Sequence, residues 1–187
     1  MGKKGKTARL KRKPAPAFWP IHRKELPWVA KPSSGPHSLE HCLPLTLVLR
    51  DILGVAQTRK EGQLILAQGK VLVDGKVRKK DDFPVGLMDV ISMPDMDKYY
   101  RVMPSHKGLV LTPISKEQSN TKLVRVEDKA TVHNGVQIVL HDGTNMLIKV
   151  ADPKHPQEVK YETFDILKVT YPEKQVVQSL KTKEGNL

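Results

Sequence analysis

The residues with the clearest chemistry in this sequence are lysines and arginines, and they gather in its N-terminal part. Among 187 residues, 32 are Lys or Arg and 20 are Asp or Glu, which gives a formal charge of +12 and a pI near 9.8. All of the excess positive charge falls within residues 1–80, whereas residues 81–187 are close to neutral. Ammonium and guanidinium groups bind phosphate, so the expected partner is a polyanion, most commonly a nucleic acid.

Two runs of basic residues carry the predicted contacts to RNA. Cations would neutralise phosphates, and rings beside them would stack on bases or pack in grooves. In the first run the candidates are Lys3, Lys4, Lys6, Arg9, Lys11, Arg12, Lys13, Trp19, Arg23, Lys24 and His37. In the second run they are Arg50, Arg59, Lys60, Lys70, Lys76, Arg78, Lys79 and Lys80. For the first run, the alternative is a solvated tail that contains a nuclear-localisation-like or transit-like sequence.

The position of a candidate affects how well it suits phosphate binding. Arg59 and Lys60 stand at the start of a predicted helix, where free backbone N–H groups already favour a phosphate. His37 has an alternative role as a cap for the start of the helical region. Any one cation taken alone could be a solvated surface charge of little consequence. As a group, the cations favour a phosphate-binding surface.

The sequence lacks the usual motifs of catalysis and metal binding. It has no phosphate-binding glycine loop, no HExxH zinc motif and no GxSxG nucleophile motif. His37, His41 and Cys42 lack a second Cys or His pair at ligand spacing. The adjacent Asp81 and Asp82 would point apart in an extended segment, so we expect turn residues rather than an acid and base pair. We therefore expect no enzyme activity, catalytic residue, metal, cofactor or small-molecule substrate.

Cysteine content and apolar runs indicate the compartment. The longest apolar run, residues 43–49, is far shorter than the roughly 20 residues that span a bilayer, so we expect no membrane contact. The single cysteine, Cys42, cannot form an internal disulfide, and we expect it to be a buried small hydrophobe. These features favour a reducing, cytoplasmic location.

Residues 1–42 are predicted to form an extended basic arm. Six prolines between residues 14 and 36 fix φ and remove backbone donors, and the segment has no consistent hydrophobic period. Both tryptophans of the chain, Trp19 and Trp28, lie here, outside any obvious core. We therefore expect a chain without residues 1–31 to fold but to bind RNA poorly.

Residues 43–93 read as a small domain of two helices and a β-hairpin. Pro44 suits the first turn of a helix, apolar residues follow at helical spacing from Leu45 to Leu53, and Gly54 stands just beyond, which predicts the first helix. Thr58 and Glu61 have the spacing of a capping box and predict a second helix that ends at Gly69. The Asp74-Gly75 pair between two short apolar runs predicts a hairpin, because a type I′ turn needs positive φ at both positions.

Residues 94–184 are predicted to form a central, mainly antiparallel β domain, so the expected fold class is α+β. Short β-like runs alternate with turn signals such as Asn134-Gly135 and Asp142-Gly143. We expect His133, His141 and Asp142 to be exposed hairpin residues. Because this domain is nearly neutral, we expect it to contact RNA only through its loops and to contact neighbouring proteins as well. The predicted strands are 88–93, 99–103, 109–112, 123–126, 130–133, 136–141, 145–150 and one or two within 159–170.

Several motifs between residues 43 and 93 together have a recognisable pattern. They are Thr58-Arg59-Lys60-Glu61, Leu66-Ala67-Gln68-Gly69-Lys70-Val71, Val73-Asp74-Gly75-Lys76-Val77-Arg78 and Gly86-Leu87-Met88-Asp89-Val90-Ile91-Ser92. These motifs resemble those of an S4-type RNA-binding domain, and more specifically the one in the small-subunit ribosomal protein S4e family of archaea and eukaryotes. The N-terminal run Leu10-Lys11-Arg12, Ala15-Pro16, Trp19 and the run 31–37 are similar to that family's arm.

The resemblance implies an archaeal structural constituent of the small ribosomal subunit, which binds ribosomal RNA beside other small-subunit proteins in the cytoplasm. It also implies that the cations of residues 50–78 lie on or near the RNA-facing surface. Residues 185–187 resemble the opening of the KOW-type module that usually follows in this family, so we expect the module to be truncated or absent here. The alternative function is a free-standing S4-type factor that binds ribosomal particles reversibly.

Overall fold

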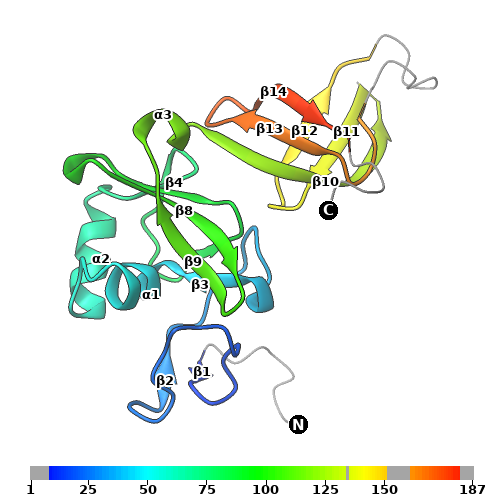
Figure 1. Ribbon diagram of the computed structural model, residues 1–187. Coiled ribbons are helices and arrows are strands. Elements are labelled where there is room, and N and C mark those ends of the chain that lie inside the picture. The colour runs from blue at the N-terminus through cyan, green and yellow to red at the C-terminus, as the bar shows by residue number, and fades with distance from the viewer. Residues whose placement is uncertain (1–8, 134, 151–160, 182–187) are drawn as a thin grey trace.

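The computed structural model describes residues 9–133, 135–150 and 161–181, and its described part is an α+β fold (Figure 1). Lys3, Lys4, Lys6, Asn134 and the motif at 185–187 lie outside these ranges. Within the described residues there are two five-stranded antiparallel sheets and two smaller strand pairs. None of the described helices has the length and apolar character needed to cross a membrane.

The N-terminal segment forms a closed loop rather than the extended arm we predicted. Strands β1 (Leu10–Lys11) and β2 (Trp28–Val29) pair antiparallel and bring its two ends together. The loop between them is held by two guanidinium groups. Arg12 donates from Nε to the Trp28 carbonyl at 3.2 Å, and Arg23 donates to the carbonyls of Arg12, Lys13, Ala15 and Pro16 at 2.7–3.0 Å.

Trp19 lies in the core, which corrects the expectation for this tryptophan. Its side chain is 3% exposed, and its Nε1 donates to the Cys42 carbonyl at 2.8 Å. Ala15 is buried in the same cluster, together with Leu43, Leu47 and other residues of the small domain. A deletion of residues 1–31 would therefore remove part of the core, so we no longer expect such a chain to keep its stability.

Both predicted helices are present. The first begins later than expected because Leu43 and Pro44 belong to β3 (Cys42–Pro44), which pairs with β6 (Pro84–Gly86). A 3₁₀ turn (Leu39–His41) precedes β3, and α1 (Leu45–Leu47) continues into a π-helical turn (Val48–Ile52). The second helix, α2 (Arg59–Ala67), has the predicted capping box, with Thr58 Oγ1 accepting from the Glu61 N–H at 3.2 Å.

The first five-stranded sheet has the order β5-β4-β7-β8-β9 and extends well beyond the predicted boundary at residue 93. Its hairpin has the predicted turn, with φ of 49° at Asp74 and 71° at Gly75. Val102 of β8 is part of the same buried cluster as Trp19, so β8 and β9 belong to the small domain. The strands are β4 (Leu72–Val73), β5 (Lys76–Val77), β7 (Val90–Met93), β8 (Lys98–Ser105) and β9 (Gly108–Pro113), with a 3₁₀ turn (Pro94–Met96) before β8.

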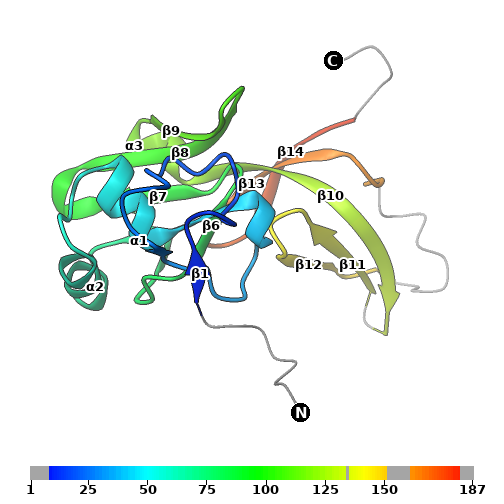
Figure 2. The same cartoon turned by 90° about the horizontal axis from the view of Figure 1, so that it is seen from below.

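The second sheet has the order β12-β11-β10-β13-β14 and its own apolar core. We predicted two strands where the structure has one, β10 (Thr121–Val132), which pairs with β13 along its first half and with β11 along its second (Figure 2). The register shifts between Val126 and Asp128. The other elements are α3 (Lys116–Ser119), β11 (Gly135–Leu140), β12 (Asn145–Ile148), β13 (Ile166–Thr170) and β14 (Gln175–Leu180), the last of which we did not predict.

Candidate nucleic-acid interface

Exposed cations surround the N-terminus of α2. Arg59 donates from Nε to Asp81 Oδ2 at 2.6 Å, which ties the start of the helix to the turn at residues 81–82. The Arg59 side chain stays 54% exposed in this pair. Lys60, Lys79 and Lys80 are exposed as well. A helix N-terminus offers partly positive backbone N–H groups, so this end of α2 suits an anion.

Other predicted cations of the small domain differ in how much charge they present. Lys70 and Lys76 are exposed, and Lys70 lies 3.8 Å from an Asp95 carboxylate oxygen. Arg78 is half-buried, with its guanidinium 4.3 Å from the centroid of the Phe83 ring. Arg50 forms a two-point pair with Asp51 at 2.6 and 2.8 Å, so its guanidinium already has a carboxylate partner.

The N-terminal candidates divide into surface residues and structural residues. Arg9, Lys11, Lys13 and Lys24 are exposed. Arg12 is buried, and Arg23 is half-buried with its donors on four carbonyl groups, so the guanidinium groups of both stabilise the loop. Trp19 is buried and cannot stack on a base. The prediction that Arg12 and Trp19 contact RNA is corrected for that reason, whereas the contact of Arg23 stays a prediction.

His37 is also internal, which corrects its prediction as an RNA contact or a helix cap. Its side chain is 5% exposed, and Nε2 lies 2.9 Å from Asp89 Oδ2. The His37 ring packs on Gly86, where a Cβ would come within 2.3 Å of the ring, so glycine is required at that position. The same Asp89 oxygen accepts the Gly86 N–H at 2.8 Å.

Asp89 belongs to a buried ionic cluster that joins the two sheets. At its centre is the ammonium group of Lys122 on β10, whose side chain is 1% exposed. Lys122 Nζ donates to Asp74, Asp89 and Asp142 at 2.8, 2.6 and 3.1 Å. Tyr171, just beyond β13, donates its hydroxyl to Asp142 at 2.8 Å. The expectation that Asp142 is exposed is wrong, because its side chain is buried in this cluster.

The cluster shifts the pKa values of its members in opposite directions. Burial alone would lower the pKa of Lys122, but the three carboxylates outweigh it and hold this pKa above its usual value. Burial and repulsion from Asp89 raise the pKa of Asp74 to about 6. At Asp89 and Asp142 burial acts upward, yet the hydrogen bond from His37 at the first and the Lys122 ammonium at both hold the pKa below its usual range. Three carboxylates facing one ammonium make Asp74 the acid that protonates most readily.

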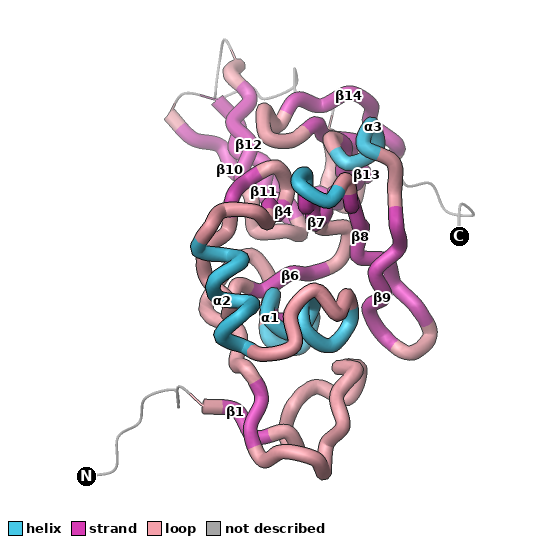
Figure 3. The backbone as a smooth tube through the Cα atoms, turned by 90° about the vertical axis from the view of Figure 1, so that its left-hand side faces the viewer, coloured by secondary structure: helices cyan, strands magenta, loops and turns pink. Residues whose placement is uncertain are grey.

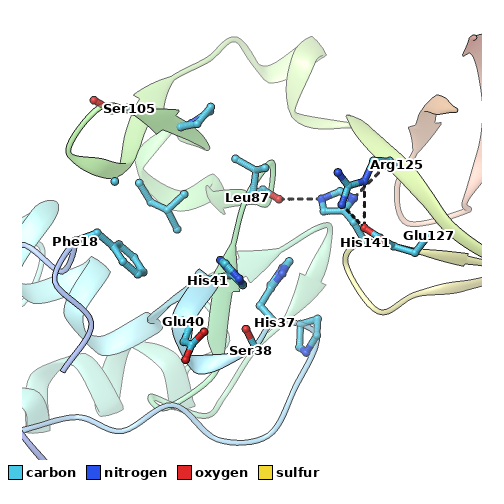
Figure 4. A pocket seen from close by; sticks show the side chains of 14 residues that line it. Phe18, His37, Ser38, Glu40, His41, Leu87, Ser105, Arg125, Glu127 and His141 are labelled. Atoms are coloured by element: carbon cyan, nitrogen blue, oxygen red, sulfur yellow. Dashed lines mark hydrogen bonds and ion pairs between the residues drawn. The ribbon is translucent and has the colours of Figure 1, made fainter. Parts of the chain in front are cut away.

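A groove of about 650 Å³ separates the small domain from the second sheet (Figure 4). His41 and His37 lie on one side and His141 on the other, with the His37 and His141 ring centroids 6.5 Å apart. His141 is half-buried rather than exposed as expected, and it accepts the Arg125 N–H at Nδ1. Burial lowers the pKa of His141.

Cys42 is fully buried, as predicted, and burial together with the charge of Asp89 raises its pKa to about 12. Asp81 and Asp82 lie in a turn, also as predicted. Across the described ranges, no group of three or more His, Cys, Asp or Glu side chains is arranged to hold a metal ion.

Known protein families and relatives match this chain along nearly its whole length. Three family descriptions apply: the RS4NT (NUC023) domain at residues 4–40, the S4 domain at residues 45–91 and Ribosomal family S4e at residues 96–176. The small ribosomal subunit protein eS4 of Staphylothermus marinus is 48% identical over 189 aligned positions, which cover 100% of this chain and 75% of the relative. The chain belongs to the S4e family.

Other S4e relatives agree with this assignment. The small ribosomal subunit protein eS4 of Methanosphaera stadtmanae is 44% identical and is matched over 75% of its length by 100% of this chain. The crystal structure of the 30S ribosomal protein S4e from Thermoplasma acidophilum is 30% identical, with a TM-score of 0.62 over 78% of this chain and 72% of that one. The resemblance seen in the sequence is therefore confirmed, together with the α+β fold class.

The sequence analysis did not identify the buried ionic cluster around Lys122. Lys122 and Tyr171 were not singled out and Asp74 was predicted only as a turn residue, because the residues they bind are 20 to 48 positions away in the chain. One signal was present: Lys122 alternates with the buried Val124 and Val126 along β10, which places it on the inner face of the sheet. Trp28 was also passed over, although it is the exposed tryptophan of the pair.

Proposed function

We propose that this S4e chain is a structural constituent of the small ribosomal subunit and binds folded ribosomal RNA of that subunit. Its family and the names of its relatives support this function. The observation that carries it to particular residues is the group of exposed cations around Arg59, at the N-terminus of α2. This role needs no catalytic group, in accord with a family described as ribosomal.

The proposed RNA-binding surface joins the N-terminal loop to the small domain. Figure 3 places the β1 loop and both helices at one end of the molecule and the second sheet at the other. Phosphates would bind the exposed cations and displace counterions, so affinity should fall steeply with salt. The surface is formed by Arg9, Lys11, Lys13, Lys24, Arg59, Lys60, Lys70, Lys76, Lys79 and Lys80, with Arg78 at its edge.

The near-neutral second sheet has a different proposed role. Its described residues offer few clustered cations, so we infer that it meets neighbouring small-subunit proteins and touches RNA only through its loops. The location that follows is the ribosome in the cytoplasm.

Neutralising Arg59 and Lys60 tests the RNA-binding surface. We expect Arg59→Gln with Lys60→Gln to weaken binding to small-subunit ribosomal RNA and to reduce the slope of log affinity against log salt by about 2, roughly 1 for each phosphate contact. Filter binding across a salt series measures both quantities. The matched control is Lys116→Gln with Lys149→Gln, which removes the same charge from exposed positions outside the small domain. An equal effect of the control would show that net charge alone acts.

A further inference from the structure

Trp28 is an exposed aromatic side chain set among cations. It lies on β2, in the N-terminal loop, and is 48% exposed, in contrast to the buried Trp19. Arg9 and Lys11 each place their charged group 5.9 Å from the centroid of the Trp28 ring. Both cations therefore lie over the ring near the outer limit of a cation–π contact, and about half of the side chain stays open to a ligand.

A polar groove of about 330 Å³ runs beside this ring. Arg9 and Lys31 line it from the N-terminal loop, and Arg59 lines it from the start of α2. Asp82 contributes one carboxylate, so the charged lining holds three cations against one anion. The groove therefore meets the proposed RNA-binding surface at Arg59, and its volume lies at the lower end of the range for small-ligand sites.

The combination of a flat exposed ring and several cations has a specific chemical preference. An unpaired base can stack on an aromatic face, whereas a base within a duplex has both faces covered by its neighbours. The phosphates on either side of such a base need cations at a short distance. Arg9, Lys31 and Arg59 are placed around the ring to supply them.

We propose that Trp28 and this groove form a binding site for an unpaired RNA nucleotide, with the base stacked on the indole and its phosphates held by Arg9, Lys31 and Arg59. The inference rests on the proposed function and deepens it, because it divides the surface into two kinds of contact. Cations around Arg59 would hold phosphates of any folded RNA. Trp28 would select a position where a base is free of pairing.

Substitution of Trp28 in the full chain tests this site. We expect Trp28→Leu to weaken binding of a short oligouridylate by roughly 5- to 100-fold, the range that corresponds to loss of one stacked base. Trp28→Phe retains an aromatic ring and should restore most of the affinity. The salt slope should stay the same in both variants because no charge is removed. Binding of a blunt RNA duplex of equal length should be unaffected.

The structure offers controls for folding and for location. The Trp28 backbone carbonyl, which accepts from Arg12, remains in every variant, so the loop should keep its shape. Leu26→Ala removes a different apolar side chain, 54% exposed in the same loop, and should leave oligouridylate affinity unchanged. Oligouridylate should quench tryptophan fluorescence in the original chain but not in Trp28→Phe, where only the buried Trp19 remains.

Three results with RNA would overturn the site. These are an original chain that does not bind oligouridylate, a Trp28→Leu chain that binds it normally, and an equal loss of oligouridylate and duplex binding. Competition by polyglutamate that depends on Trp28 would also overturn it, in favour of an acidic peptide. Failure of the proposed function is separate: the chain would then not bind small-subunit ribosomal RNA, whatever residue stands at position 28.

Discussion

Trp19 shows how a single residue turns the N-terminal segment into part of the fold. Its ring is buried with Leu43 and Leu47, and its Nε1 donates to the Cys42 carbonyl. We expect Trp19→Ala to lower the free energy of unfolding by about 3–5 kcal/mol, the usual effect of emptying a buried aromatic site. Trp28→Ala should change it by less than about 0.5 kcal/mol. Denaturant unfolding of both variants measures the contrast, and equal effects would contradict the burial of Trp19.

Asp74 should make the folded state less stable as the pH rises, which is opposite to the effect of most buried, paired carboxylates. Its folded-state pKa, about 6, lies above the unfolded value near 3.8, so the folded state binds this proton more tightly. The stabilisation is present in full below about pH 4 and is lost as the pH rises through 6. Asn at this position mimics the protonated acid and also tolerates the φ of 49°.

The measurement compares Asp74→Asn with the original chain by denaturant unfolding at several pH values. Between about pH 4 and pH 6, the stability of the variant should rise relative to the original by about 1–3 kcal/mol. Because Asp89 and Asp142 are present in both chains, their opposite pH dependence cancels to first order in the difference. A constant difference, or one of opposite sign, would show that Lys122 keeps Asp74 ionised.

At the residue scale, the sequence predicts charge well and burial poorly. Exposed cations such as Lys60 and Lys76 could be predicted because a lone lysine is costly to bury. Arg12 and His37 could not be placed in advance, because each is compensated by groups distant in the chain: Arg12 by the Trp28 carbonyl and His37 by Asp89. A polar residue becomes internal when the fold brings it a partner, and no local pattern records that partner.

Among the elements, those with local stop and start signals could be predicted and those defined by long-range pairing could not. The capping box of α2 and the Asp74-Gly75 turn act over a few residues, and both are present. The predicted strands 123–126 and 130–133 leave a gap between them, yet β10 continues through it because its two halves pair with different strands. Strand β14 is mostly exposed and lies at a sheet edge, so it carries little hydrophobic pattern.

Lys122 joins elements of both sheets, and its loss should be costly. It binds the β4–β5 turn through Asp74, the segment before β7 through Asp89 and the β11–β12 turn through Asp142. We expect Lys122→Met to lower the free energy of unfolding by about 3–5 kcal/mol, because three carboxylates remain buried without their cation.

Unfolding at two pH values tests this account of Lys122. The deficit of Lys122→Met should shrink as the pH is lowered, because protonation removes the repulsion among the carboxylates. Lys116→Met is the matched control on an exposed lysine and should change stability by less than about 0.5 kcal/mol at either pH. A pH-independent deficit would mean that Lys122 acts through packing rather than charge.

At the scale of the whole molecule, the excess positive charge lies in the N-terminal part of the chain, and the C-terminal part is nearly neutral. Exposed cations cluster on the N-terminal loop and the small domain. The second sheet is joined to the first through the long strand β10 (Figure 1) and through the hydrogen bonds of Lys122. Such an arrangement suits a protein held between RNA on one side and proteins on the other. Many simultaneous contacts of this kind should make its place in a ribosomal particle permanent rather than transient.

Sedimentation of the native protein in a cell lysate tests this central claim most directly. Sucrose gradients would be run before and after a high-salt wash that strips loosely bound factors. The account predicts that the protein stays on the small subunit through the wash, in a stoichiometric amount. Release into the light fractions would contradict it and would favour a factor that binds ribosomal particles reversibly.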